Sequence, residues 1–190
     1  PLLLLSNLAG ANDWREAAQL RENAREHQAE GLMLKRKKST YQSGRKRGDW
    51  WKWKSEPYTL DLVLIYAQRG HGRRANLYTD FTFAARNDDG ELITLTKAYS
   101  GLTDREFQEI NRFIRANTID SFGPVRSVKA ELVFELAFEG INRSNRNKSG
   151  FALRFPRIKR WRQDKKVDEI NSIKDVEELW VQSNYPDSEE

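Results

Sequence analysis

The sequence contains no cysteine and only two histidines among its 190 residues. The lack of cysteine excludes disulfides and thiolate-ligated metal sites. His27 and His71 are too few to complete a zinc site between them. No apolar run approaches the roughly 20 residues that a membrane-spanning helix requires, and the opening Pro-Leu-Leu-Leu-Leu lacks the basic flank of a signal peptide. We therefore expect a soluble cytoplasmic protein with no membrane partner, whose first residues are the cut end of a longer chain.

Acidic residues are scarce in one part of the chain and basic residues in another. The net charge is +5, but residues 34–54 hold nine Lys and Arg against one acid. Residues 167–190 hold eight acids against one lysine. A basic surface that is concentrated in this way is typical of a protein that binds a nucleic acid.

A second basic segment, residues 150–166, begins with the pattern of a strand. Phe151, Leu153 and Phe155 alternate with Ala152 and Arg154, which is the period of a half-buried β-strand. Proline cannot donate to a strand ladder, so we expect Pro156 to end the regular pairing. Guanidinium groups match phosphate oxygens especially well, although a solvated basic strand end would show the same charge pattern. Six cations follow the proline: Arg157, Lys159, Arg160, Arg162, Lys165 and Lys166.

The middle of the chain predicts a small β-barrel. A helix follows the capping box of Thr103 and Glu106. The strands are predicted at 59–68, 75–86, 91–98, 131–140 and 151–155. Strand, strand, strand, helix, strand, strand is the element order of an OB-fold, a five-stranded barrel that binds oligonucleotides. The predicted fold class is therefore mainly β with some α, with an OB-fold barrel over residues 56–166.

The N-terminal part predicts a helix over residues 14–27 and two strands, 30–35 and 50–54. In the second strand, Trp51 and Trp53 face one side and Lys52 and Lys54 face the other. Two lysines fixed on one strand face can hold a phosphate. Lysines that protect an exposed strand edge are the alternative reading.

The order of these residues resembles the ATP-dependent DNA ligases. Ser-Gly-x-x-x-Arg-Phe-Pro-Arg followed by Arg-x-Arg-x-Asp-Lys, from Ser149 to Lys165, is similar to the last signature motif of that family. Glu30-Gly31-Leu32-Met33-x-Lys35 and Trp51-Lys52-x-Lys54 resemble its fourth and fifth nucleotidyltransferase motifs. The likeness covers most of residues 28–166.

The resemblance implies roles for individual residues. Glu30 would help to bind a divalent metal, Mg²⁺, and Lys52 and Lys54 would hold the AMP phosphate. Arg162, Asp164 and Lys165 would orient the pyrophosphate of ATP. The residues expected at the DNA are Arg154, Phe155, Arg157, Arg73 and Arg74. From the sequence alone, Phe155 also fits the barrel core, and Arg73 and Arg74 also fit a solvated loop.

The family's nucleophilic lysine lies in a Lys-x-Asp-Gly motif, and no such tetrapeptide occurs here. The resemblance therefore implies three parts: the C-terminal remnant of an adenylation domain over 1–55, an OB domain over 56–166, and a helix with an acidic tail over 167–190. The parent protein would seal nicks in duplex DNA through lysine–AMP and DNA–adenylate intermediates, and we expect the fragment alone to be inactive.

Two other functions are compatible with the same pattern. A messenger-RNA capping nucleotidyltransferase shares the two-domain plan, but the Arg-Phe-Pro-Arg segment favours a ligase. A non-catalytic OB module that only binds nucleic acid is the alternative from another class. A ligase would use ATP and nicked DNA in the cytoplasm at the nucleoid, and the remnant's open strand edges predict self-association of the fragment.

Overall fold

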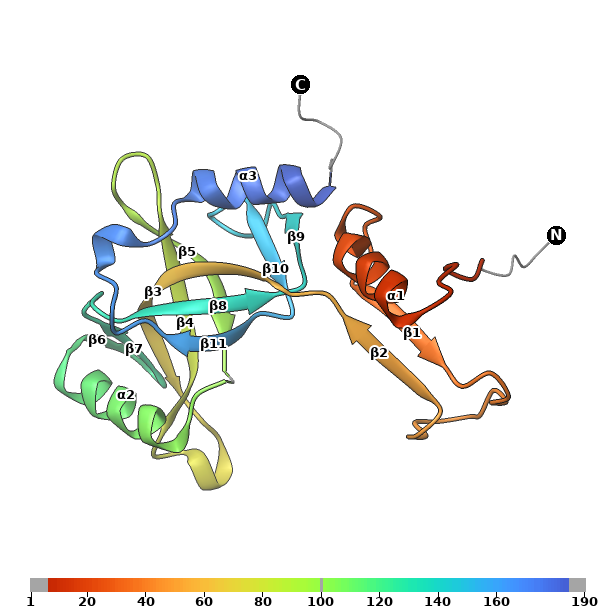
Figure 1. The fold of residues 1–190 in the computed structure, drawn as a ribbon. Coiled ribbons are helices and arrows are strands. Elements are labelled where there is room, and N and C mark those ends of the chain that lie inside the picture. Colours follow the sequence, from red (N-terminus) through yellow and green to blue (C-terminus); the bar gives the residue numbers. More distant parts are fainter. Residues whose placement is uncertain (1–6, 100, 185–190) are drawn as a thin grey trace. The chain divides into compact units, whose positions relative to one another are not determined.

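The computed structural model describes residues 7–99 and 101–184. The chain forms two compact units, Pro1–Glu56 and Pro57–Glu190. The helices and strands of both units are labelled in Figure 1. Within the described residues, no helix is long and apolar enough to cross a membrane.

The first unit consists of a short helix and a two-stranded antiparallel sheet. Helix α1 (Trp14–Glu22) begins after Asp13, whose side chain accepts hydrogen bonds from the backbone N–H groups of residues 15 and 16. A 3₁₀ turn, η1 (Asn23–Arg25), follows it. Strands β1 (Gly31–Lys35) and β2 (Trp50–Lys54) pair along their whole length. The strand predicted at 50–54 is confirmed, and the predicted helix ends five residues earlier than expected.

The second unit is built around five strands, which are joined by four antiparallel pairings. Its barrel strands are β3 (Tyr58–Arg69), β4 (Tyr78–Arg86), β5 (Leu92–Ala98), β8 (Val133–Phe138) and β11 (Arg157–Trp161). They are hydrogen-bonded in the order β11-β8-β3-β4-β5. This is the strand order of an OB-fold, and the predicted fold class is confirmed.

The barrel closes where β11 meets the loop after β5. Gly101 has a φ of 106°, and a Cβ placed on it would lie 1.6 Å from the Ile158 carbonyl oxygen. Only glycine lets the two backbones approach so closely. Helix α2 (Asp104–Ala116) follows, and its Thr103–Glu106 capping box is confirmed.

Helix α2 packs below the barrel in the view of Figure 1. Ile110 and Ile114 of this helix are completely buried, and the Phe107 ring packs edge to face against the Phe81 ring. Asn111 is buried as well, and its amide exchanges two hydrogen bonds with the backbone of Tyr78, at 2.7 and 3.2 Å. These bonds anchor the start of β4.

The strand predicted at 151–155 is not the fifth barrel strand, and this prediction was wrong. Strand β10 (Phe151–Arg154) pairs with β9 (Gly140–Arg143) in a separate two-stranded sheet. The fifth barrel strand is β11, which begins after Pro156 and pairs with β8. The proline therefore separates two strands instead of ending the β-structure.

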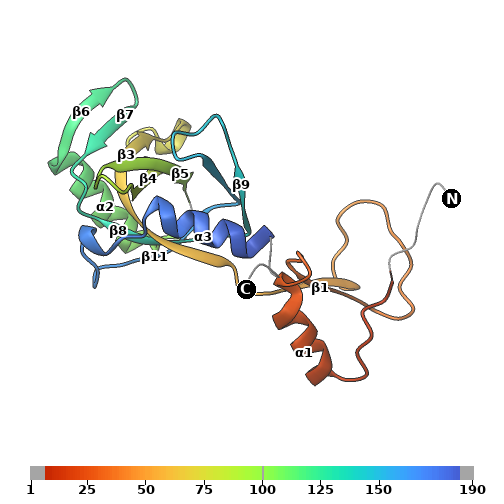
Figure 2. The same ribbon diagram turned by 90° about the horizontal axis from the view of Figure 1, so that it is seen from above.

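Two further elements complete the second unit. Strands β6 (Thr118–Phe122) and β7 (Val125–Val128) form a hairpin that the sequence reading missed, and it projects from the barrel in Figure 2. After the turn η3 (Val167–Glu169), helix α3 (Ile173–Asn184) buries Val176 against the core. Ser172 caps this helix by accepting a bond from the Asp175 N–H. The acidic tail beyond residue 184 lies outside the described residues.

Candidate nucleotide and nucleic-acid interface

In the first unit, the lysines of β2 share a sheet face with Glu30 beside them. The register places Lys52 opposite Met33 and Lys54 opposite Gly31. Trp53, on the other face, contacts Trp14 of α1 at 6.0 Å between ring centroids. The lysines therefore point away from the helix. The Lys54 ammonium lies 3.4 Å from a Glu30 carboxylate oxygen.

Gly31 makes this arrangement possible. It has a φ of 131°, and a Cβ there would meet the Trp53 carbonyl oxygen at 2.3 Å. Any other residue would push β1 away from β2 at this position, so glycine lets the strand approach its partner directly after Glu30. Lys35 shares the face, and its ammonium lies 4.3 Å from the Trp50 ring centre.

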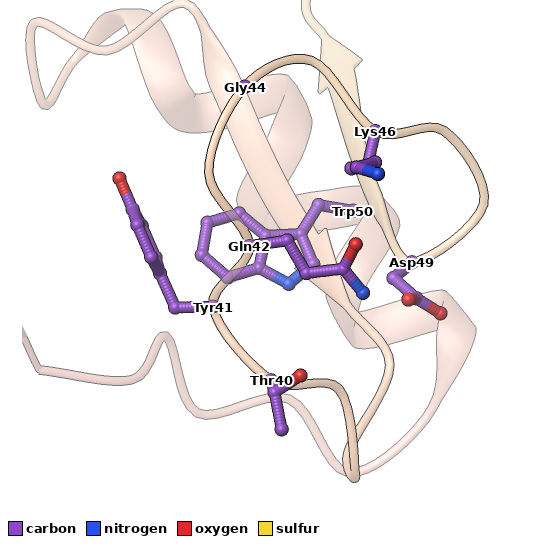
Figure 3. A pocket seen from close by; sticks show the side chains of 7 residues that line it. All are labelled: Thr40, Tyr41, Gln42, Gly44, Lys46, Asp49 and Trp50. Carbon is purple, nitrogen blue, oxygen red and sulfur yellow. The ribbon is translucent and has the colours of Figure 1, made fainter.

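The connector between β1 and β2 folds back into a small pocket that the sequence reading missed. Figure 3 shows the Tyr41 and Trp50 rings at its wall, and their centroids are 5.7 Å apart. The Trp50 indole donates to the Ser39 hydroxyl at 3.0 Å, and Arg36 pairs with Asp49 at 2.8 Å. The pocket is lined by Thr40, Tyr41, Gln42, Gly44, Lys46, Asp49 and Trp50.

In the second unit, Phe155 lies on the surface and not in the core. Its φ is 51°, and its side chain is 67% exposed. The Arg154 guanidinium lies 5.6 Å from its ring centre. A bulky residue with a positive φ is strained, and such residues concentrate at functional sites. The barrel-core interpretation of Phe155 is therefore wrong.

Three cations of the second basic segment, Arg157, Lys159 and Arg160, pair with the chain's own carboxylates. Glu135 lies in β8 and Glu139 directly follows that strand, and both side chains are almost completely buried. Lys159 and Arg160 both pair with Glu135, and Arg157 pairs with Glu139 at 3.2 Å. Carboxylates of the chain itself therefore offset the charge of these three cations.

Electrostatics at Glu135 follow from these contacts. Burial opposes its ionisation, but hydrogen bonds from Lys159 and Arg160 outweigh burial and lower the pKa of Glu135. The carboxylate therefore stays charged and paired near neutral pH.

The three residues expected at the pyrophosphate of ATP form one cluster. The Arg162 guanidinium donates through Nε and Nη2 to both Asp164 oxygens, at 2.9 and 2.8 Å. The hydrogen bond from Arg162 lowers the pKa of Asp164 to about 2 and raises the pKa of Arg162. Lys165 joins them through a fourth residue, Asp61 of β3, whose carboxylate accepts bonds from both cations.

Sequence reasoning did not assign a role to Asp61. The signal was a single acid inside the apolar strand 59–68, because a buried carboxylate requires a cationic partner. The identity of that partner was not accessible, since Arg162 and Lys165 lie 101 and 104 residues further along the chain.

Arg73 and Arg74 lie in the turn η2 (Gly72–Arg74) that follows the end of β3, and both are exposed. Arg157 lies near the other end of β3, because it pairs with Ala137, which in turn pairs with Thr59. The residues expected at the DNA are therefore divided between two places on the barrel. The Glu30–Lys52–Lys54 group belongs to the first unit.

Family models match both units of the chain. The model described as the ATP dependent DNA ligase domain matches residues 4–54, and that of the ATP dependent DNA ligase C terminal region matches residues 74–165. A probable DNA ligase of Koribacter versatilis is 44% identical over 90% of this chain and 30% of its own length. DNA ligase 1 of Korarchaeum cryptofilum is 38% identical over 95% of this chain and 33% of its own length.

Solved structures share the fold. The ligase domain of LigD from M. tuberculosis aligns with a TM-score of 0.51 and 24% identity, over 80% of this chain and 50% of that chain. A structure of a Lig E DNA ligase aligns with a TM-score of 0.50 and 19% identity, over 79% of this chain and 47% of that chain. The chain spans about a third of the length of the curated relatives it matches. With matches across both units and relatives over nine-tenths of its length, the chain belongs to the family of ATP-dependent DNA ligases.

Proposed function

We propose that this chain is part of an ATP-dependent DNA ligase that seals nicks in duplex DNA through lysine–AMP and DNA–adenylate intermediates. The observation that carries the proposal is the lysine face of β2. Lys52 and Lys54 project from one side of a sheet, with Glu30 beside them, inside the segment that matches the ligase domain model. Two ammonium groups at fixed positions supply the charge that an AMP phosphate requires.

We assign residues 1–55 to the end of the adenylation domain, 56–166 to the OB domain and 167–190 to a C-terminal helix with its tail. Neither domain contains a Lys-x-Asp-Gly motif in this sequence. The 190-residue chain therefore lacks the nucleophile for the first step, and we expect it to be inactive by itself.

Magnesium fits the carboxylate of Glu30. Mg²⁺ is commonly held by one or two carboxylates together with substrate phosphates and water. Glu30 is about one-third exposed, and its partner Lys54 is a phosphate-binding candidate, so a metal and a phosphate could be bound side by side. Bound Mg²⁺ would neutralise charge on the phosphates. Within the described residues, no cluster of three or more acidic or histidine side chains forms a metal site by protein ligands alone.

The DNA-binding role falls to the exposed residues of the barrel. Phe155 and Arg154 present a ring and a guanidinium at a strained surface position, a combination suited to pressing into a minor groove. Arg73 and Arg74 extend from a loop at the far end of β3. Arg157 would contact a phosphate only in competition with Glu139.

The chain has two further expected properties. Its first unit is a two-stranded sheet with no other strand partner among the described residues, so its edges favour self-association of the fragment. A ligase acting on chromosomal DNA would work in the cytoplasm at the nucleoid.

Labelled ATP tests the proposal directly. The full-length ligase, incubated with Mg²⁺ and ATP labelled in the AMP moiety, should acquire an acid-stable covalent label and seal a nicked duplex. The 190-residue chain should acquire none. Lys52→Ala in the full-length protein should reduce labelling strongly, while Lys46→Ala, an exposed lysine of the neighbouring connector, serves as the matched control. Label on the isolated chain, or a full-length protein that binds DNA without sealing it, would contradict the proposal and indicate a binding module.

A further inference from the structure

Asp61 is a buried acid at the start of the first barrel strand, and its backbone is held on both sides. The Asp61 N–H donates to the Asn171 side-chain oxygen at 2.7 Å, and the Asp61 carbonyl accepts from the Asn171 N–H at 2.9 Å. The residue itself is 8% exposed. These bonds fix where its carboxylate points.

The carboxylate of Asp61 joins two cationic side chains. One oxygen accepts from Arg162 Nη1 at 3.0 Å and from Lys165 Nζ at 2.7 Å. The second oxygen lies 3.3 Å from the same Arg162 nitrogen. The two cationic side chains are only 14% and 29% exposed, so both are held close to the barrel wall.

The backbone supports the same geometry. The Arg162 N–H donates to the Val133 carbonyl at 2.8 Å, and the Lys165 N–H donates to the Arg162 carbonyl at 3.2 Å. The turn and the carboxylate together therefore fix both ends of each long side chain. A long cation that is already ordered loses less rotamer freedom when it binds an anion.

We propose that Asp61 is a positioning residue for ATP, which holds Arg162 and Lys165 side by side for the pyrophosphate. The inference rests on the proposed function, because it assumes that these two cations meet ATP. Asp61 need not touch the nucleotide. An ammonium carries three N–H donors and Asp61 accepts one of them, so Lys165 keeps donors for a phosphate.

Glu135 provides a matched control. It lies directly opposite Asp61 in the β3–β8 register and is equally buried, at 8% exposure. It also pairs with two cations, but these are Lys159 and Arg160 instead of Arg162 and Lys165. The charge of Glu135 also raises the pKa of Arg162, but less than that of Asp61 does. A general effect of removing a buried carboxylate would be of similar size in both variants, whereas a positioning effect would be much larger at Asp61.

The test uses the full-length ligase with Asp61→Asn, Asp61→Glu and Glu135→Gln. Steady-state sealing of a nicked duplex at varied ATP concentration gives KM for ATP. Single-turnover sealing of a pre-adenylated nick at saturating DNA reports the step that needs no ATP. We expect Asp61→Asn to raise KM about tenfold or more, the size of a lost charge-assisted contact, with sealing changed less than about twofold. Asp61→Glu keeps the charge and should recover part of the loss. Glu135→Gln should leave both measurements within about twofold.

Three outcomes would overturn the inference. The first is an equal loss of adenylation and of sealing in Asp61→Asn. The second is a rise in KM for ATP in Glu135→Gln as large as that in Asp61→Asn. The third is a lower KM for ATP in Asp61→Asn, which would mean that Asp61 competes with ATP for the cations. If Asp61→Asn does not fold, Asp61→Glu decides: an unchanged KM counts against positioning and a raised KM with intact sealing supports it. An unmodified full-length protein that does not adenylate would instead refute the proposed function.

Discussion

The two units of the chain bury very different amounts of apolar surface. In the second unit, the inner faces of the barrel strands and one side of α2 form a continuous core, with Phe83 and Leu62 fully buried. Among residues 7–56, the buried hydrophobic residues are Ala17 and Ala24, while Trp51 is 47% exposed. The barrel is therefore a self-sufficient scaffold. The first unit presents its lysines on a sheet that has little core of its own.

Truncating the barrel core should have the largest effect on stability. Phe83 is fully buried and meets Phe134 edge to face at 5.4 Å between centroids. We expect Phe83→Ala to lower the free energy of unfolding by about 4 kcal/mol, measured by urea denaturation of the 190-residue chain. Trp53→Ala in the first unit should leave that main transition within about 1 kcal/mol. Similar losses in the two variants would show that the units unfold as one.

Barrel closure should be nearly as sensitive. Gly101→Ala puts a methyl group 1.6 Å from the Ile158 carbonyl oxygen, so the loop or β11 must move. We expect a loss of about 3 kcal/mol in the free energy of unfolding. Gly90→Ala is the control, because Gly90 also has a positive φ, 83°, but no atom lies within 4 Å of its ideal Cβ. Gly90→Ala should lower the free energy of unfolding by only about 1 kcal/mol. Equal losses in the two variants would mean that backbone strain, and not the close approach to Ile158, determines the effect of Gly101→Ala.

Acid should weaken the carboxylate pairs on the outer face of the barrel. The pKa of Glu135 is lowered in the folded chain, so its contribution is complete above the ordinary glutamate value of 4.5 and is lost as pH falls below it. Glu135→Gln should cost about 1 kcal/mol at pH 7 and progressively less toward pH 3. Thermal melts across this range measure the difference. A stability difference between the unsubstituted chain and Glu135→Gln that grows as pH falls would contradict the lowered pKa of Glu135.

The smallest predicted effect is a change in the DNA affinity of the isolated chain when Glu135 is substituted. Because several β11 cations are paired internally, the salt dependence of binding should reflect fewer free charges than the sequence contains. Glu135→Gln frees Lys159 and Arg160 and should tighten binding to a duplex about twofold to threefold at low salt. Fluorescence anisotropy across a salt series is the measurement, with Glu109→Gln, on α2, as a control acid. Unchanged affinity in Glu135→Gln would show that these cations do not face DNA.

Local pattern predicted most of the barrel from the sequence. Strands 59–68 and 91–98 and the helix after Thr103 follow from apolar periodicity and a capping box, and all three are present within a few residues. Strand β11 was missed because Ile158 is its one fully buried residue and cations surround it. The hairpin at Gly123 was missed although Gly-Pro is a turn signal.

The charge balance of the candidate site could not be predicted from the sequence. The resemblance to the ligases named Lys52, Lys54, Arg162 and Lys165 as site residues, and their roles stay predictions. The neutralising partners come from other strands, so Asp61 and Glu139 become visible only once β3, β8 and β11 lie side by side. The position of Phe155 was not predictable either. Its alternation with Leu153 suggested a core position, but its positive φ breaks the strand pattern and the residue is exposed.

The central claim is that residues 154–165 serve two different steps, with Phe155 at the DNA and Asp164 at the nucleotide. Its most direct test measures lysine adenylation and sealing of a pre-adenylated nick for Asp164→Ala and Phe155→Ala in the full-length ligase. We predict that Asp164→Ala blocks adenylation and spares sealing, because Asp164 accepts hydrogen bonds from Arg162 Nε and Nη2. Phe155→Ala should spare adenylation and impair sealing, with an unchanged melting temperature because its ring is exposed. Equal losses in both steps for both variants would contradict the claim.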